Sequence, residues 1–175
     1  MAHGPASPKT IAAGDVVQVH LAPIASGCTV DLCRTFLVEP VAEDAAKTLR
    51  AYVEAQERGM ASAAPGAALM GIDAAMAASL EQAGFGGAFL RPVFHGVGIE
   101  QEEAPIPGGH AVIHGEQKVE EVAAGMVLGI GNCGIYREHF GVRVEDTVWV
   151  TEQGPVLLAH YPKILDATHS QEPNR

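Results

Sequence analysis

The chain has 175 residues, enough for one domain with a hydrophobic core and too few for two typical domains. Hydrophobic residues make up 47% and charged residues 18%, so the composition is that of a globular chain and excludes general disorder. The formal net charge of -10 repels phosphate backbones, which argues against nucleic acid as a partner.

The three cysteines, Cys28, Cys33 and Cys133, match neither a disulfide framework nor a zinc-binding spacing. Such an odd, sparse count is typical of a reducing compartment. No apolar run reaches the roughly 18 residues that a membrane span needs, and no signal peptide opens the chain. We therefore expect a cytoplasmic protein without a membrane partner.

The first third of the chain predicts a β-hairpin. Residues 1–14 are rich in Gly, Pro, Ala and Ser and are expected to form a loop. The β-branched run at residues 16–21 predicts one strand, and residues 28–38, after a turn at Ser26-Gly27, predict a second. The hairpin is expected over residues 15–38.

A helical pair is expected over residues 41–84. Residues 41–64 are Ala-rich and repeat large apolar side chains at roughly helical spacing, until Pro65 and Gly66 break the pattern. A second helix is expected from residue 70 to residue 83, because Gly84 is a natural C-terminal stop.

The remainder, residues 88–165, is β-rich. Strands are expected near residues 88–93, 110–112, 127–130, 142–151 and 156–160, and the polar tail after Lys163 is expected to fray. Phe36 and Trp149 are expected in the core. Hairpin, two helices and several strands predict a single α+β domain over residues 1–175.

Four residues have the chemistry of metal ligands on strands. They are His20 and Asp31 on the arms of the hairpin, His95 before Gly96, and Glu145 inside an apolar strand. Imidazole and carboxylate suit a divalent metal, and charged groups in apolar strands need a partner or an ion. Taken singly, each has a plain alternative: a histidine on a strand is usually structural, and Glu145 beside Asp146 also fits a solvated edge.

Their order along the chain resembles a known family. Residues 14–21 read Gly-Asp-Val-Val-Gln-Val-His-Leu and resemble the Gly-Asp-(apolar)3-Asp-(apolar)-Gly segment of the pita-bread fold. That fold is shared by methionine aminopeptidase, aminopeptidase P, prolidase and creatinase. Residues 31–36, Asp-Leu-Cys-Arg-Thr-Phe, resemble the family's Asp-Ile-Thr-Arg-Thr-Phe, whose Asp is the second metal ligand.

Further motifs follow in the family's order. They are the helix end at residues 81–85, His-Gly-Val-Gly-Ile-Glu at 95–100, Gly-Met-Val-Leu at 125–128, and Val-Arg-Val-Glu-Asp-Thr-Val at 142–148. The chain is thus identified as a member of the pita-bread family. The resemblance implies a curved, mainly antiparallel sheet with helices on one face. Because the chain begins late, it also implies an N-terminally truncated domain, either a fragment or a natural truncation.

Three departures from the family pattern concern the metal site. His20 replaces the first ligand Asp, and Glu102 replaces a second active-site His. The fourth ligand, a Glu in Ile-Glu-Pro-Gly-Ile-Tyr, is absent from the longer segment at residues 130–136. Either Gly131 or Asn132 occupies its position, and the extra residue predicts a bulge.

The resemblance implies two metals in the family, but loss of carboxylates leaves charge for at most one here. Its expected ligands are His20, Asp31, His95 and Glu145, a set that suits zinc, manganese or iron. His3 resembles a family His near the substrate pocket, and Glu102 or Glu103 is expected to handle protons.

Three functions remain open. The first is an Xaa-Pro peptidase-like hydrolase of peptides or amide-like small molecules with an altered metal site. The second is a metal-free, creatinase-like hydrolase, and the third is a catalytically inactive binding module. The absent helical layer also predicts self-association, or low stability without the missing N-terminal segment, because alternate residues of 16–21 should lie bare.

Overall fold

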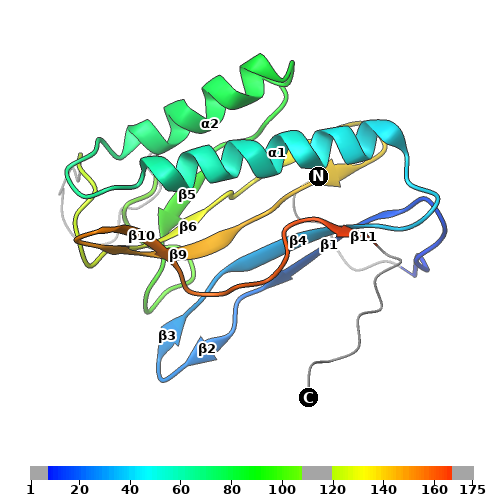
Figure 1. The fold of residues 1–175 in the computed structure, drawn as a ribbon. Helices are drawn as coiled ribbons and strands as arrows, with labels where there is room; N and C mark the ends of the chain where they lie inside the picture. The colour runs from blue at the N-terminus through cyan, green and yellow to red at the C-terminus, as the bar shows by residue number, and fades with distance from the viewer. Residues whose placement is uncertain (1–7, 108–119, 167–175) are drawn as a thin grey trace.

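The computed structural model describes residues 8–107 and 120–166 (Figure 1). Two helices, α1 (Glu43–Ser62) and α2 (Met70–Gln82), lie side by side over one face of the strands (Figure 1). This is the α+β architecture that the order of elements predicts. Over the described parts of the chain, neither helix is long and apolar enough to cross a membrane.

The strands form two main sheets. One has three strands in the order β1 (Val16–Leu21), β4 (Leu32–Leu37), β11 (Leu165–Asp166). The other has four in the order β10 (Gly154–Leu157), β9 (Asp146–Thr151), β6 (Val127–Ile130), β5 (Phe94–Gly96). Two short hairpins pair β2 (Ile24–Ala25) with β3 (Cys28–Thr29) and β7 (Ile135–Tyr136) with β8 (Gly141–Val142).

The mainly antiparallel character is as predicted, since among the strands of the described residues only β11 pairs in parallel, with β4. The strands form two separate hydrogen-bonded ladders, whereas a single sheet was expected. They are joined at an isolated bridge between Cys33 and Glu145. The strand expected over residues 142–151 is divided into β8 and β9. Glu145 lies between the two and forms the bridge to Cys33 of the hairpin.

Other boundaries differ from the prediction. The strand expected at residues 88–93 forms instead at Phe94–Gly96, and Phe89 makes only an isolated bridge with Ile135. The tail after Lys163 was expected to fray, but its first residues form β11 beside β4. The strand expected at residues 110–112 lies outside the described residues.

Helix α1 is amphipathic, with one mainly apolar face turned to the interior. Buried residues of α1 recur every three or four positions, at Ala45, Leu49, Tyr52, Gln56 and Gly59. Added at Gly59, a Cβ would lie 2.7 Å from Met76 Cγ, so glycine lets α2 approach α1 closely. Through its buried face α1 also contacts β4, β6, β8 and β10.

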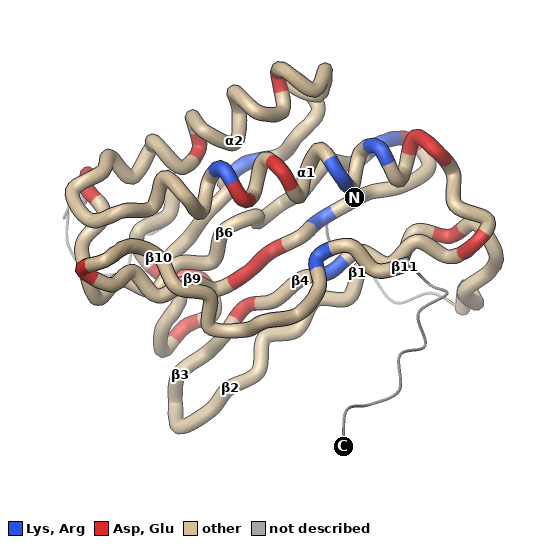
Figure 2. The backbone as a smooth tube through the Cα atoms, in the orientation of Figure 1, with Lys and Arg blue, Asp and Glu red and all other residues tan. Residues whose placement is uncertain are grey.

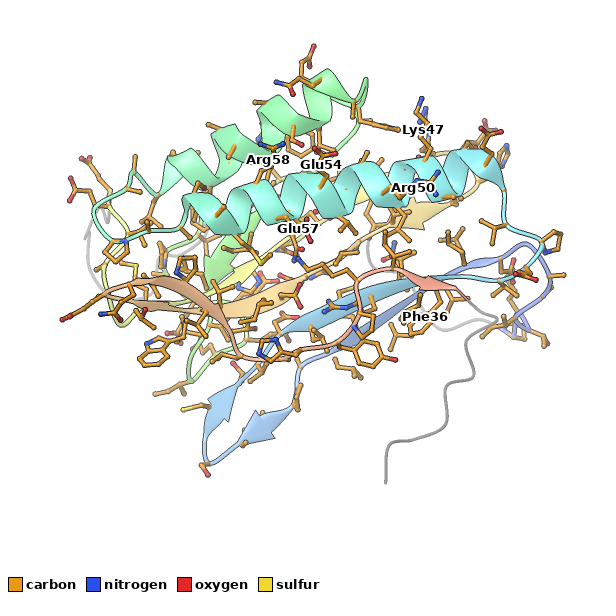
Figure 3. All side chains as sticks on the ribbon, viewed as in Figure 1. Phe36, Lys47, Arg50, Glu54, Glu57 and Arg58 are labelled. Atoms are coloured by element: carbon orange, nitrogen blue, oxygen red, sulfur yellow. The ribbon has the colours of Figure 1, made fainter. Side chains whose placement is uncertain are left out.

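The outer face of α1 is charged. Basic and acidic positions are interspersed along it (Figure 2), and the side chains of Lys47, Glu54 and Arg58 lie on the side away from the sheets (Figure 3). Trp149, expected in the core, is 47% exposed, because its neighbours Val148 and Val150 take the helix-facing side of β9. Phe36 is half-buried beside β11 (Figure 3).

Candidate metal centre

The first hairpin supplies an imidazole and a carboxylate. In the β1–β4 register His20 lies opposite Cys33, and Asp31 immediately precedes β4. Asp31 is fully buried, and its main chain is fixed to β9. Its N–H donates to Thr147 Oγ1 over 2.8 Å, and its carbonyl accepts from the same hydroxyl over 2.8 Å. The hairpin therefore holds both side chains against the second sheet.

Glu145 reaches the site through the bridge between the sheets. The N–H of Cys33 donates to the Glu145 carbonyl over 3.0 Å, and the N–H of Glu145 donates to the Cys33 carbonyl over 3.0 Å. This reciprocal pair sets Glu145 beside the hairpin, with no exposed surface. A carboxylate so placed requires charged or hydrogen-bonding partners.

His95 comes from β5, where it pairs across the ladder with Gly129. A Cβ at Gly129 would lie 2.8 Å from His95 Cε1 and 3.2 Å from Glu145 Oε1, so glycine leaves room for both side chains. His95 Nδ1 lies 2.9 Å from the Gly96 carbonyl, an acceptor that requires a hydrogen on Nδ1. The other nitrogen, Nε2, faces the site.

Three of the four predicted ligands, His20, Asp31 and Glu145, converge on one another, and His95 contacts the two carboxylates of that group. His20 Nε2 is hydrogen-bonded to Asp31 Oδ1, and His95 Nε2 lies 3.0 Å from Glu145 Oε1 and 3.8 Å from Asp31 Oδ2. One donor atom from each of His20, Asp31 and Glu145 lies within 4.8 Å of the others. Ligands at about 2.0–2.2 Å from one ion lie up to about 4.4 Å apart, so a small side-chain adjustment suffices.

The position of the missing fourth ligand is closed by a bulge. After β6, the N–H groups of Gly131 and Asn132 both point at the Val93 carbonyl, at 2.8 and 3.2 Å. Gly131 has a φ of 107°, and a Cβ there would overlap the carbonyl oxygen of Val144. Asn132 uses its Oδ1 locally, accepting from the N–H of Cys133 over 2.8 Å. The predicted bulge is present, and neither residue supplies a ligand oxygen.

A buried arginine forms an ion pair with the second carboxylate oxygen of Glu145. Arg143, 3% exposed, donates from Nη2 to Glu145 Oε2, while His95 bonds Oε1. A carboxylate that bridges two ions needs both of its oxygens free. The residues present therefore fit one divalent ion and do not fit two.

The electrostatics favour an ionised Asp31. Burial raises the pKa of Asp31, but the hydrogen bonds from His20 and Gln101 and the nearby imidazoles outweigh it, so the pKa lies below its ordinary value. For His95, burial lowers the pKa, but the hydrogen bond and charge of Glu145 outweigh that effect and raise it. The charged form of each group is therefore favoured by the oppositely charged partner beside it.

The remaining predicted residues lie at the rim or beyond it. Glu102 is exposed on the loop after β5, and its charge acts on His95 and raises the pKa of that imidazole. His3 lies outside the described residues. Sequence reasoning missed Gln101, whose amide donates to Asp31 Oδ2 over 3.0 Å. Its only signal in the sequence was a polar residue six positions after His95, which many surface loops share.

Comparisons with known proteins give a consistent result. A model of metallopeptidase family M24 matches residues 1–152. The Xaa-Pro dipeptidase of Pyrococcus furiosus is 34% identical over 157 residues, which cover 89% of this chain and 43% of the relative.

Solved structures agree. The prolidase from Pyrococcus horikoshii OT3 aligns with a TM-score of 0.79 and 30% identity, over 92% of this chain and 44% of that one. The dipeptidase PepE from Mycobacterium ulcerans aligns with a TM-score of 0.80 and 30% identity, over 91% and 42%. The chain has the pita-bread fold of these neighbours, and it spans less than half of their length.

Proposed function

This chain belongs to metallopeptidase family M24, and we propose that it is a prolidase-like hydrolase of Xaa-Pro peptides or amide-like small molecules. The convergence of His20, Asp31 and Glu145 to within 4.8 Å carries this proposal. Its two carboxylates are buried and come from both sheets, and His20 is partly exposed beside them, which is the disposition of a functional site that solvent and substrate can reach.

We assign the site one divalent ion, held by His20, Asp31, His95 and Glu145. Two imidazoles and two carboxylates suit zinc, manganese or iron. When bound, such an ion supplies Lewis acidity, which polarises a scissile carbonyl and acidifies a water. The chain's own part is to hold these side chains in position, through the Thr147 contact of Asp31 and the Cys33 bridge of Glu145.

Proton transfer falls to Glu102 in this proposal. Its neighbour Glu103 is engaged in the loop, where Oε2 accepts from the N–H of Glu100 over 3.1 Å. Glu102 is exposed and close enough to act on His95, which is the disposition of a group that exchanges protons with substrate and solvent. His3, beyond the described residues, is the proposed substrate contact.

The test is elemental analysis of the purified protein together with hydrolysis of an Xaa-Pro dipeptide. We expect at most one divalent ion per chain and activity that is lost on chelation and restored by the metal. Asp31→Ala should weaken binding more than His20→Ala, because Asp31 is buried and anionic whereas His20 is 26% exposed and contributes a neutral nitrogen. Two ions per chain, or hydrolysis that persists without metal, would contradict this assignment.

A binding module without catalysis is the second candidate function. One observation favours it: both oxygens of Asp31 and of Glu145 already have partners within the chain. A site satisfied in this way is stable without an ion. Absence of metal and of hydrolysis, together with retained binding of an Xaa-Pro peptide, would favour this function.

A further inference from the structure

Gln101 lies among the proposed ligands. Its side-chain amide is 3.0 Å from Asp31 Oδ2 and 3.4 Å from His20 Nε2. Two neighbouring ligand atoms of one ion, each at about 2.0–2.2 Å from it, are separated by roughly 2.8–3.6 Å for ligand–metal–ligand angles between a right angle and the tetrahedral angle. The amide therefore lies at the spacing expected of a ligand that shares an ion with Asp31 and His20.

The loop that carries Gln101 is held in place by Thr29 of β3. The N–H of Thr29 donates to the Gly98 carbonyl over 2.7 Å, and its Oγ1 lies 3.0 Å from the carbonyls of both Gly98 and Glu100. Thr29 is only 8% exposed. Because Thr29 and Asp31 belong to the same arm of the hairpin, this contact positions Gln101 relative to Asp31.

The other end of the loop is closed on β5. The N–H of Gly96 donates to the Glu103 carbonyl over 2.9 Å, and the N–H of Glu103 donates back to Gly96 over 3.0 Å. Glu103 also packs where Gly98 has no side chain: a Cβ there would lie 2.8 Å from the Glu103 carboxyl carbon. Gln101 is thus fixed from both sides rather than carried on a free loop.

We propose that Gln101 is a further metal ligand, whose amide oxygen supplies a donor in place of the absent fourth-ligand Glu. The inference rests on the proposed metal-dependent function. A rotation of the terminal amide exchanges its nitrogen and oxygen at nearly the same position, so Oε1 replaces the N–H group when an ion replaces the proton between His20 and Asp31. A neutral amide adds a ligand without adding charge. As a hard oxygen donor it favours manganese over softer ions.

Metal titration of the full chain tests this ligand. Binding of Mn²⁺ is measured by calorimetry, and binding of Co²⁺ by visible absorption, whose intensity depends on coordination number. Gln101→Leu should weaken binding at least about tenfold and change the Co²⁺ spectrum, as loss of a ligand or its support does. Gln101→Glu, of equal length, should bind at least as tightly as the parent chain. Gln153→Leu, the same change at an exposed turn, should alter neither property.

Melting curves recorded without metal show whether each variant folds. Gln101→Asn, whose amide is too short to reach the site, should lose metal affinity as Gln101→Leu does. Unchanged affinity and spectrum in Gln101→Leu, with binding abolished in Asp31→Ala, would overturn the ligand role and leave the proposed metal site intact. Failure of the parent chain to bind either ion would overturn both.

Discussion

Cys33 shows how burial at the site lowers the reactivity of a single thiol. It is fully buried opposite His20, and burial raises the pKa of its thiol to about 12. Cys133 is half-buried at the end of the bulge, and burial raises its pKa as well. Cys28, in the short β2–β3 hairpin, is exposed. Only thiolates react readily, so the three cysteines should differ in the native state.

We expect one thiol, Cys28, to react quickly with a disulfide reagent at pH 8, and Cys133 to react more slowly. Cys33 should react only after denaturation, since its pKa leaves almost no thiolate at that pH. Peptide mapping after timed labelling identifies each site. Labelling of Cys33 in the folded protein at the rate of Cys28 would contradict the buried, bridged position of the hairpin.

At the scale of elements, the bulge after β6 depends on Gly131. Tyr52 of α1 supports it, with Oη 2.8 Å from the Gly131 carbonyl and 3.1 Å from that of Asn132. The N–H of Gly134 donates to Tyr52 Oη over 3.1 Å. Helix and bulge are therefore fixed together, and the bulge has no room for a side chain at Gly131.

Gly131→Ala should destabilise the chain more than Gly154→Ala. Both glycines have positive φ, 107° and 118°, so each substitution costs about 1–3 kcal/mol of backbone strain. Only at Gly131 does the new Cβ overlap a neighbour, the Val144 carbonyl, while nothing lies within 4 Å of one at Gly154. This overlap adds roughly 1–3 kcal/mol. Urea denaturation measures the difference, and equal costs would show that the bulge relaxes freely.

Arg34 joins three elements through one guanidinium. It pairs with Asp146 of β9 at 2.5 Å and donates to the carbonyls of Glu145, Tyr161 and Pro162 over 2.9 Å each. Gln56 of α1 donates to the other oxygen of Asp146 over 2.9 Å. The hairpin, the second sheet and the segment leading to β11 thus share one buried ion pair.

Arg34→Ala should cost up to about 3–5 kcal/mol of unfolding free energy, because it leaves buried Asp146 with Lys163, 3.8 Å away, as its remaining cation. Arg58→Ala serves as the control. Arg58 pairs with Glu54 at 3.4 Å on the exposed face of α1, and a pair of that kind contributes below about 0.5 kcal/mol. Chemical denaturation of both variants decides the matter. A cost for Arg34→Ala no greater than that of Arg58→Ala would mean that Asp146 finds another partner.

At the scale of the molecule, one face of the first sheet carries exposed apolar side chains among the described residues. An apolar groove of about 320 Å³ is lined by Val19, Leu21, Leu32, Arg34, Phe36 and Tyr161. Val19 is 39% and Leu21 54% exposed, on alternate positions of β1 as the sequence predicts. β1 is also an edge strand of its sheet. An apolar face beside a strand edge favours association between chains.

We expect the isolated chain to self-associate in sedimentation velocity, because burial of each such side chain contributes about 1.5–3 kcal/mol. The double variant Val19→Lys with Leu21→Lys should shift the distribution toward monomer. Met70→Lys, at the exposed start of α2, should leave it unchanged. A concentration-independent monomer with a melting temperature above about 65 °C would contradict the expectation.

The sequence by itself determined the family and the succession of hairpin, two helices and strands, and it proposed four residues for the site. It could do so because helical periodicity, turn residues and the metal-ligand motifs are all local patterns, legible within a few positions. The same patterns placed α1 and α2 within two residues of their ends and marked the bulge through one extra residue.

Only the tertiary structure decided how these pieces meet. The bridge of Cys33 to Glu145 and the approach of Gln101 to Asp31 join residues 112 and 70 positions apart, and Gly131 is closed in by Val93 and Val144, 38 and 13 positions away. The register of two separate ladders sets them, and a register is a property of the packed sheets rather than of any segment. Trp149 illustrates the same limit, since a strand's alternation does not say which of its two faces the helices will cover.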